Sequence, residues 1–298
     1  MSWIQFIIET QASEIEATEN LLEDLGSLAI TLEDNADTPL FEPPLGTTPL
    51  WQDTRVIGLF DQQCDTQLIQ NALRQKFGQQ TPIRFEILED KNWQTEWMKH
   101  YQPIQMGQRL WVCPEWQTPP EPDAVNLMLN PGLAFGTGTH PTTALCLKWL
   151  DQASLAQKTV VDFGCGSGIL GIAAQLLGCA QVYAVDNDPQ ALISSRENAT
   201  LNHVEGKIQV FSPEQVQALH DKEHFQADVM VANILANPLI SLAPMLASMT
   251  KAGGDIILSG ILEQQADLVI EAYRAYFDDF EVKAEGEWRL IHARRTQS

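Results

Sequence analysis

The sequence predicts an α/β protein, a doubly wound parallel sheet flanked by helices, preceded by a smaller ferredoxin-like α+β domain. Three observations predict it. From about residue 140 strand-like segments alternate with helical ones, the strand that ends at Phe163 runs directly into a glycine-rich turn, and the first 92 residues have the order βαββαβ. A chain of 298 residues exceeds the usual size of one domain, so two domains are expected.

The first 92 residues show the strand and helix signals of the ferredoxin-like split motif. Ser13 and Glu16 are spaced like a capping box at the start of the first helix, and Gly26 and Gly78 are placed to end the two helices. Such a fold is a common binding platform, but the fold by itself names no ligand. The expected elements are strand 3–9, helix 12–26, strands 28–34 and 55–60, helix 65–78 and strand 83–89.

A tryptophan-rich junction, residues 93–116, follows this domain. It holds four of the eight tryptophans, whose large rings are suited to packing two domains together, with direct contact to substrate as the alternative. The predicted organisation is therefore a ferredoxin-like domain over residues 1–92, the junction over 93–116 and a larger domain over 117–298.

The larger domain alternates strands with helices, and its early strands are apolar on both faces, as in a parallel sheet that helices bury. The ligand site of a doubly wound sheet lies beyond the carboxyl ends of its strands. Residues 280–295 predict two more strands joined near Glu285 and Gly286, a hairpin at or near the edge that brings the sheet to seven strands. The other five strands are 159–164, 181–186, 208–212, 227–234 and 254–261, and helices are expected to begin near Pro141, Ile169, Pro189, Pro238 and Glu263.

The chain is strongly acidic, with a formal net charge of −21. Its first 92 residues hold 5 Lys and Arg against 16 Asp and Glu, so the small domain is the more acidic per residue. Affinity for nucleic acid comes from cations that neutralise phosphates, so this charge opposes direct nucleic-acid binding and favours a basic partner. The alternative is that the acidic surface serves only solubility.

The composition also predicts where the protein works. No apolar run approaches the roughly 20 residues that a membrane helix needs, and the N-terminus lacks a basic region ahead of an apolar stretch. Five scattered cysteines without a C-x-x-C pair fit a reducing compartment and argue against structural zinc. We therefore expect a cytoplasmic protein with no membrane segment and no metal site. Because the sequence shows no obvious extra apolar surface, we also expect a monomer.

The first site signal is the turn that follows strand 159–164, with glycines that let the backbone approach a ligand closely. Gly166, Gly168 and Gly171 also satisfy the dinucleotide pattern G-x-G-x-x-G, and Asp186 follows Gly166 by 20 residues. Asp162, two residues before the turn's first glycine, distinguishes a dinucleotide from S-adenosylmethionine as the ligand. A carboxylate there would repel a pyrophosphate and attract the ammonium and sulfonium groups of S-adenosylmethionine.

Two further signals come from strand ends. Asp186 is placed to accept hydrogen bonds from both hydroxyls of a ribose, while Asp188, just before Pro189, is a better N-cap of the following helix. Asn233, at the end of strand 227–234, has a carbonyl oxygen that can accept from an amine and hold its lone pair toward a methyl group.

The fourth signal is a glycine- and threonine-rich loop, residues 130–143, which closes on a helix that begins near Pro141. Free N–H groups at that helix start, together with a threonine hydroxyl, are suited to holding a carboxylate. A tight connection without any ligand is the alternative.

Together these segments resemble the PrmA family of ribosomal protein methyltransferases, which modify ribosomal protein L-eleven (L11) of the large subunit. The resemblance covers nearly the whole chain and is looser over the first 92 residues. The first and last of the matching strings are specific to that family, whereas the glycine turn alone indicates only a methyltransferase. The strings are NPGLAFGTGTHPTT, VVDFGCGSGILGIAA, YAVDNDP and VANILANPL.

The resemblance implies a class I methyltransferase fold of Rossmann-like type, with S-adenosylmethionine as cofactor. It implies a cofactor pocket contacted by Thr143, Gly164, Asp186 and Asn233, to which the glycine turn adds Gly166. It also implies methylation of amino groups, the N-terminal α-amine and lysine ε-amines of L11, with the small domain recognising the substrate. As catalytic residues we expect Asn233 to orient the amine and His140 to line the acceptor pocket.

Other functions remain open from the sequence. A methyltransferase of this fold acting on another basic protein or on a nucleic acid is the nearest, although the Asn-Pro-Pro-aromatic clamp for a planar base is absent. A nicotinamide-dependent oxidoreductase and a binding protein without catalysis are more distant. His220 to His224 match the zinc pattern H-x-x-E-H, but we expect that segment to be a short polar connection and not a metal site.

Overall fold

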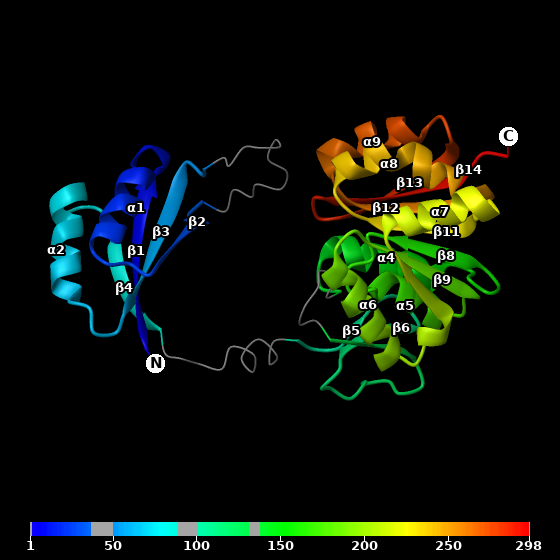
Figure 1. Cartoon of the computed structure of the whole chain (residues 1–298), viewed down its shortest axis with the longest axis horizontal. Coiled ribbons are helices and arrows are strands. Elements are labelled where there is room, and N and C mark those ends of the chain that lie inside the picture. The colour runs from blue at the N-terminus through cyan, green and yellow to red at the C-terminus, as the bar shows by residue number, and fades with distance from the viewer. Residues whose placement is uncertain (1, 37–49, 89–100, 131–137, 298) are drawn as a thin grey trace. The chain divides into compact units, whose positions relative to one another are not determined.

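The structure, a computed structural model of the 298-residue chain, describes residues 2–36, 50–88, 101–130 and 138–297. The chain divides into two compact units, Met1–Lys99 and His100–Ser298 (Figure 1). Each is described by itself.

The first unit is a four-stranded antiparallel sheet in the order β2-β3-β1-β4 with two helices. This is the arrangement of the ferredoxin-like βαββαβ motif, so the predicted fold of this unit is confirmed. Its elements are β1 (Trp3–Gln11), the 3₁₀ turn η1 (Ala12–Glu14), α1 (Ile15–Asp24), β2 (Ala29–Asp34), β3 (Asp53–Asp61), α2 (Thr66–Phe77) and β4 (Ile83–Leu88).

Alternation along the strands builds the core of this unit. Phe6, Ile8 and Phe60 point from β1 and β3 to one face, where they are buried against apolar residues of both helices. The rings of Phe6 and Phe60 meet edge to face with their centroids 5.5 Å apart.

The ends of the two helices test the predicted capping. Gly78 takes a φ of +94° at the end of α2, as its position predicted. The predicted capping box of Ser13 and Glu16 is wrong, because the chain first makes a 3₁₀ turn that contains Ser13, and α1 begins only at Ile15 without a side-chain cap.

The second unit contains a seven-stranded sheet in the order β10-β9-β8-β11-β12-β14-β13. The first five of these strands run parallel, and β14 and β13 form the antiparallel hairpin at the edge. The doubly wound sheet and its terminal hairpin are therefore confirmed. Strands and helices are β8 (Thr159–Phe163), β9 (Gln181–Val185), β10 (Ile208–Phe211), β11 (Ala227–Asn233), β12 (Thr250–Leu262), β13 (Phe277–Glu285), β14 (Trp288–Arg295), α4 (Pro141–Gln152), α5 (Ile169–Leu176), α6 (Pro189–Leu201), α7 (Pro213–Glu223), α8 (Ala236–Ser248) and α9 (Ala266–Tyr273), with 3₁₀ turns η2 (Glu205–Lys207) and η3 (Glu263–Gln265).

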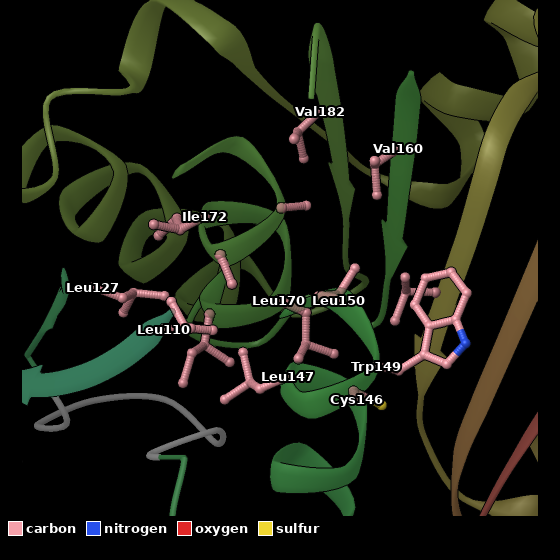
Figure 2. Packing of buried hydrophobic residues seen from close by; sticks show 14 of the residues in the cluster. Leu110, Leu127, Cys146, Leu147, Trp149, Leu150, Val160, Leu170, Ile172 and Val182 are labelled. Atoms are coloured by element: carbon pink, nitrogen blue, oxygen red, sulfur yellow. The ribbon is translucent and has the colours of Figure 1, made fainter. Parts of the chain in front are cut away.

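Helices cover both faces of this sheet, with α4, α5 and α6 on one side and α7, α8 and α9 on the other (Figure 1). Each face of the sheet has its own hydrophobic core. Successive residues of a strand point to opposite faces, so Val160 lies in the first core, beneath α4–α6, and Val161 in the second, beneath α7–α9. Figure 2 shows the first core, where leucines of α4 and α5 pack beneath Val160 and Val182.

A three-stranded sheet extends the first core, formed by β5 (Ile104–Gln105), β6 (Leu110–Pro114) and β7 (Val125–Leu129). Leu110 and Leu127 of this sheet are fully buried in that core (Figure 2). The second unit thus contains the later part of the predicted junction 93–116, and residues 93–100 lie outside the described residues. The roles assigned to the three predicted segments stay predictions.

Helix α7 corrects the sequence interpretation of residues 213–223, where a short polar connection was expected. Ser212 and Gln215 form a capping box at its start, and His220 lies in its last turn with Nδ1 2.7 Å from the carbonyl oxygen of Phe225. The apolar periodicity of this helix is weak, and Val216 is its only buried residue. Among all described helices none is long and apolar enough to span a membrane.

Candidate active site

A cavity of about 420 Å³ lies at the carboxyl ends of β8, β9 and β11. The strand order reverses here, since β9 and β11 flank β8 on opposite sides, which is where doubly wound sheets bind ligands. All six residues predicted from the sequence line this one cavity: His140, Thr143, Gly164, Gly166, Asp186 and Asn233.

The glycine-rich turn after β8 forms one wall. The N–H groups of Gly164 and Cys165 both donate to the carbonyl oxygen of Val185, at 2.7 and 3.0 Å, and so tie the turn to the end of β9. Gly164 has a φ of +76°, and a Cβ there would collide with the side chain of Ile234. This position therefore requires glycine for both its backbone conformation and its packing.

Asp186 joins the turn to the next strand end. Its Oδ2 accepts from the N–H of Gly166 at 2.9 Å, and its Oδ1 accepts from the N–H of Asp188 at 3.0 Å. Each carboxylate oxygen has a second lone pair, so the group can still accept from a ligand in the cavity. Asp188 caps α6 by accepting from the N–H of Gln190 at 2.8 Å, as predicted.

His140 has a structural function that the sequence did not suggest. It is the N-cap of α4, with Nδ1 accepting from the N–H of Thr142 at 3.4 Å and lying 2.8 Å from Thr142 Oγ1. Burial lowers its pKa below the ordinary histidine value, so the ring is held in the neutral form at neutral pH.

Asn233 and Thr143 meet across the cavity, from β11 and α4. The side-chain Nδ2 of Asn233 donates to Thr143 Oγ1 at 3.2 Å, and Thr143 is completely buried. Since the oxygen and nitrogen of an amide diverge from Cγ, this bond directs Nδ2 to Thr143 and leaves Oδ1 free to accept from another group.

Asp162 lies beneath the turn rather than in the lining of the cavity. Its Oδ2 accepts from the N–H of Gly171 at 2.8 Å, whereas its buried Oδ1 has no hydrogen-bond partner among the described residues. Burial raises the pKa of this carboxyl to about 7; the bond from Gly171 opposes that rise and the charge of Asp186 adds to it. The negative charge that the sequence placed at the turn is therefore only partly present at neutral pH.

Trp288 is a lining residue that the sequence analysis missed. It opens β14, after the turn of the terminal hairpin, and its ring meets that of His140 edge on with centroids 4.8 Å apart. The two residues are almost 150 positions apart, so only the antiparallel pairing of β14 with β12 brings Trp288 to the cavity. No local pattern in the sequence signals that.

The lining fits the S-adenosylmethionine predicted from the sequence. Ile169, Leu170 and Leu235 supply apolar walls suited to a purine ring, and the Asp186 carboxylate is suited to a ribose diol. Asp162 does not line the cavity, but the charge of its carboxyl beneath the turn favours a cationic ligand and opposes a pyrophosphate.

Comparisons with known proteins give a consistent match over the whole chain. Residues 2–296 match the family described as ribosomal protein L11 methyltransferase (PrmA). Proteins named ribosomal protein L11 methyltransferase from Hahella chejuensis (strain KCTC 2396) and Cellvibrio japonicus (strain Ueda107) are 49% and 50% identical over 295 residues, covering 99% and 98% of both chains. A crystal structure of ribosomal protein L11 methylase from Lactobacillus delbrueckii subsp. bulgaricus, 34% identical, matches 66% of this chain and 100% of its own with a TM-score of 0.59.

Proposed function

The chain belongs to the ribosomal protein L11 methyltransferase (PrmA) family, and on this premise we propose that it transfers methyl groups from S-adenosylmethionine to amino groups of ribosomal protein L11. It is an S-adenosylmethionine-dependent methyltransferase. The observation that carries the proposal is the cavity at the switch point of the sheet, which brings together the turn after β8, Asp186 and the Asn233–Thr143 pair.

Asp186 and the glycine turn are the cofactor-binding part of the proposal. The carboxylate of Asp186 would accept hydrogen bonds from the ribose hydroxyls, the backbone of Gly164 and Gly166 would lie against the nucleoside, and Thr143 would hold the amino-acid end from the start of α4. Bound there, S-adenosylmethionine supplies an electrophilic methyl group on a sulfonium. The enzyme's contribution is then orientation and exclusion of water.

Asn233 and His140 are the acceptor part of the proposal. With Nδ2 committed to Thr143, the Oδ1 of Asn233 accepts a hydrogen bond from the substrate amine and holds its lone pair in line with the methyl group. An amide cannot take up a proton, so the amine must arrive neutral. Neutral His140, beside Trp288, lines the approach without adding a positive charge that would oppose the sulfonium.

The protonation of the acceptor ranks the possible amines. At pH 7 a lysine with a pKa of about 10.4 costs roughly 4 to 5 kcal/mol to neutralise, and an α-amino group near 7.8 costs about 1 kcal/mol. The N-terminal amine of L11 is thus the easier acceptor. A lysine placed beside a sulfonium has its pKa lowered, which makes ε-amines accessible as well.

The charge of the chain supports a basic protein substrate over a nucleic acid. A net charge of −21 attracts a basic protein and repels a phosphate backbone. We further propose that the enzyme works in the cytoplasm and is a monomer. All five cysteines are free thiols, which fits a reducing compartment.

The test is to incubate the purified enzyme with L11 and trideuteromethyl S-adenosylmethionine and to map the added mass by peptide sequencing. We expect label on the N-terminal amine and on lysines of L11. A small basic protein unrelated to the ribosome and ribosomal RNA serve as control acceptors and should stay unlabelled. Label on the RNA, or on both proteins equally, would overturn the proposed substrate.

A further inference from the structure

Helix α6 presents a polar stripe to the interior of the second unit. Ser195 and Asn198 are each 1% exposed, and Asn202, directly after the helix, is 9% exposed. Their spacing of three and four positions places them on one face of the helix. Burying hydroxyl and amide groups costs free energy unless they are hydrogen-bonded, so their partners indicate what this stripe supports.

Two of the three residues bind the glycine-rich turn. Ser195 Oγ donates to the carbonyl oxygen of Gly166 at 2.9 Å, and Asn198 Nδ2 donates to the carbonyl oxygen of Ser167 at 3.0 Å. The described peptide bonds are all trans, so each carbonyl points opposite to the N–H that follows it. Anchoring two successive carbonyls therefore fixes the orientation of two successive peptide planes in the turn.

Asn198 also ties the turn to β7. Its Oδ1 accepts from the N–H of Asn130, the residue after that strand, at 3.1 Å. Asn202 holds the same strand with the same chemistry, accepting from the N–H of Met128 at 2.8 Å and donating to its carbonyl oxygen at 2.6 Å. Both asparagines thus hold β7, but of the two only Asn198 also holds the turn.

Neither Ser195 nor Asn198 lines the cavity, whereas Gly164, Cys165 and Gly166 do. The turn itself has positive φ angles at Gly164, Gly166 and Gly168, which glycine adopts without strain but does not adopt preferentially. One hydrogen bond lies within the turn, from the N–H of Gly168 to the carbonyl oxygen of Cys165 at 2.8 Å, so the rest of the choice among glycine conformations comes from contacts outside the turn.

We propose that Ser195 and Asn198 are positioning residues for the cofactor site: they hold the carbonyl of Gly166, which lines the cavity, and that of the next residue, Ser167, and so fix the turn without touching the cofactor. The inference rests on the proposed function only in taking the cavity as the place where S-adenosylmethionine binds. It assigns the bonds of Asn202, to Met128 and to the backbone carbonyl of Asn198 at 2.8 Å, to the stability of β7 and of the end of α6.

Three alanine variants of the full chain test this, with Asn202→Ala as the matched control for Asn198→Ala. Calorimetry gives the dissociation constant of S-adenosylhomocysteine, the unreactive product, and thermal denaturation gives the Tm. We expect Asn198→Ala to weaken binding about tenfold or more and Ser195→Ala about threefold, since each leaves a carbonyl of the turn without its donor. Asn202→Ala should lower the Tm as much as Asn198→Ala does and change the affinity less than about twofold.

A second readout needs no ligand. Hydrogen–deuterium exchange of the backbone amides of residues 164–168 should be faster in Asn198→Ala and in Ser195→Ala than in wild type, and unchanged in Asn202→Ala. Failure of wild type to bind the cofactor would contradict the proposed function, while exchange would still decide the present inference. Should Asn198→Ala not fold, Ser195→Ala decides. The inference would be overturned if folded Ser195→Ala or Asn198→Ala kept wild-type affinity and exchange. It would also be overturned if Asn202→Ala lost as much affinity as Asn198→Ala does.

Discussion

At the scale of single residues, buried polar groups shape the site more than exposed charges do. Asp162 is the extreme case, because its carboxyl is completely buried, receives one backbone N–H and keeps one oxygen without a partner among the described residues. Such a group is costly to ionise. A cationic ligand bound nearby would lower the free-energy cost of ionising Asp162.

This cost gives a prediction for Asp162→Asn. The pKa of Asp162 is about 7 in the folded chain and about 3.9 in an unfolded one, so between pH 4 and pH 7 the folded state binds more protons, and stability from this group falls as pH rises. Asparagine does not titrate and can still accept from Gly171. In urea unfolding, the stability of the variant relative to wild type should therefore rise from pH 4 to pH 8, by about 1 kcal/mol or more.

The matched control is Asp188→Asn, which replaces an exposed carboxylate by another good N-cap at the start of α6. Its stability relative to wild type should show no such rise. A relative stability of Asp162→Asn that stays constant or falls over this range would contradict the assigned pKa.

The residues of the site were predictable where a motif fixes them to the end of a strand. Gly164, Gly166, Asp186 and Asn233 each follow or end a parallel strand, and parallel strands bring such ends together at one edge. Trp288 was not predictable, because it reaches the cavity through an antiparallel strand near the far end of the chain. The binding and catalytic roles of all these residues stay predictions.

At the scale of elements, the turn after β8 needs a particular backbone conformation and must also pack against the loop that follows β11. Gly164 combines a positive φ with contact to Ile234, which follows β11. Gly178, between α5 and β9, has a similar φ of +101° but open space where a Cβ would lie. Substituting each glycine by alanine therefore separates the free-energy cost of a positive φ, present at both positions, from the cost of a collision with Ile234, present only at Gly164.

We therefore expect Gly164→Ala to destabilise the chain more than Gly178→Ala. Both variants carry about 1 to 2 kcal/mol of left-handed backbone strain, and Gly164→Ala adds about 1 to 3 kcal/mol for the collision with Ile234. Denaturant unfolding of both variants measures the difference. Equal losses would show that Ile234 moves aside freely, contrary to the packing described here.

Elements were predictable in proportion to their apolar pattern. The strands of the parallel sheet are apolar on both faces, and α5, with six buried residues, was placed correctly. Helix α7 buries only Val216 and was missed, and the expected capping box of α1 failed because a 3₁₀ turn displaced the helix start by more than one residue. Weak amphipathicity and local turns at helix ends are set by the tertiary structure, which propensity does not capture.

At the scale of the whole molecule, the dominant property is the net charge of −21. Attraction between a strongly acidic enzyme and a basic substrate acts over a distance that salt shortens, about 10 Å at 0.1 M and about 3 Å at 1 M. S-adenosylhomocysteine, the product used to measure binding, has no net charge at neutral pH, so the same screening has little effect on its binding.

The prediction is a selective salt dependence. Raising the salt from about 0.05 to about 0.5 M should increase the KM for L11 several-fold, because the electrostatic attraction is screened. The dissociation constant of S-adenosylhomocysteine, measured by calorimetry in the same buffers, should change far less. A KM that is insensitive to salt would show that the acidic surface serves only solubility.

The architecture of the two units was predictable because length, element order and the glycine turn each limit the choice of fold independently. The sequence placed the ferredoxin-like motif and the doubly wound sheet correctly, and the antiparallel hairpin at the sheet edge as well. Which residues form the junction was less predictable, since β6 pairs with β5 on one side and with β7 on the other in a small sheet of the second unit. Pairing between distant strands leaves little trace in a local pattern.

The most direct test of the account is methyl transfer to L11 by Asn233→Ala, measured with radiolabelled S-adenosylmethionine beside calorimetry of cofactor binding. Because Asn233 is proposed to orient the amine in the transition state, we expect kcat to fall about 100-fold or more, while cofactor affinity changes only a few-fold. Wild-type turnover in this variant would contradict the account, and so would a loss of activity explained entirely by weaker cofactor binding.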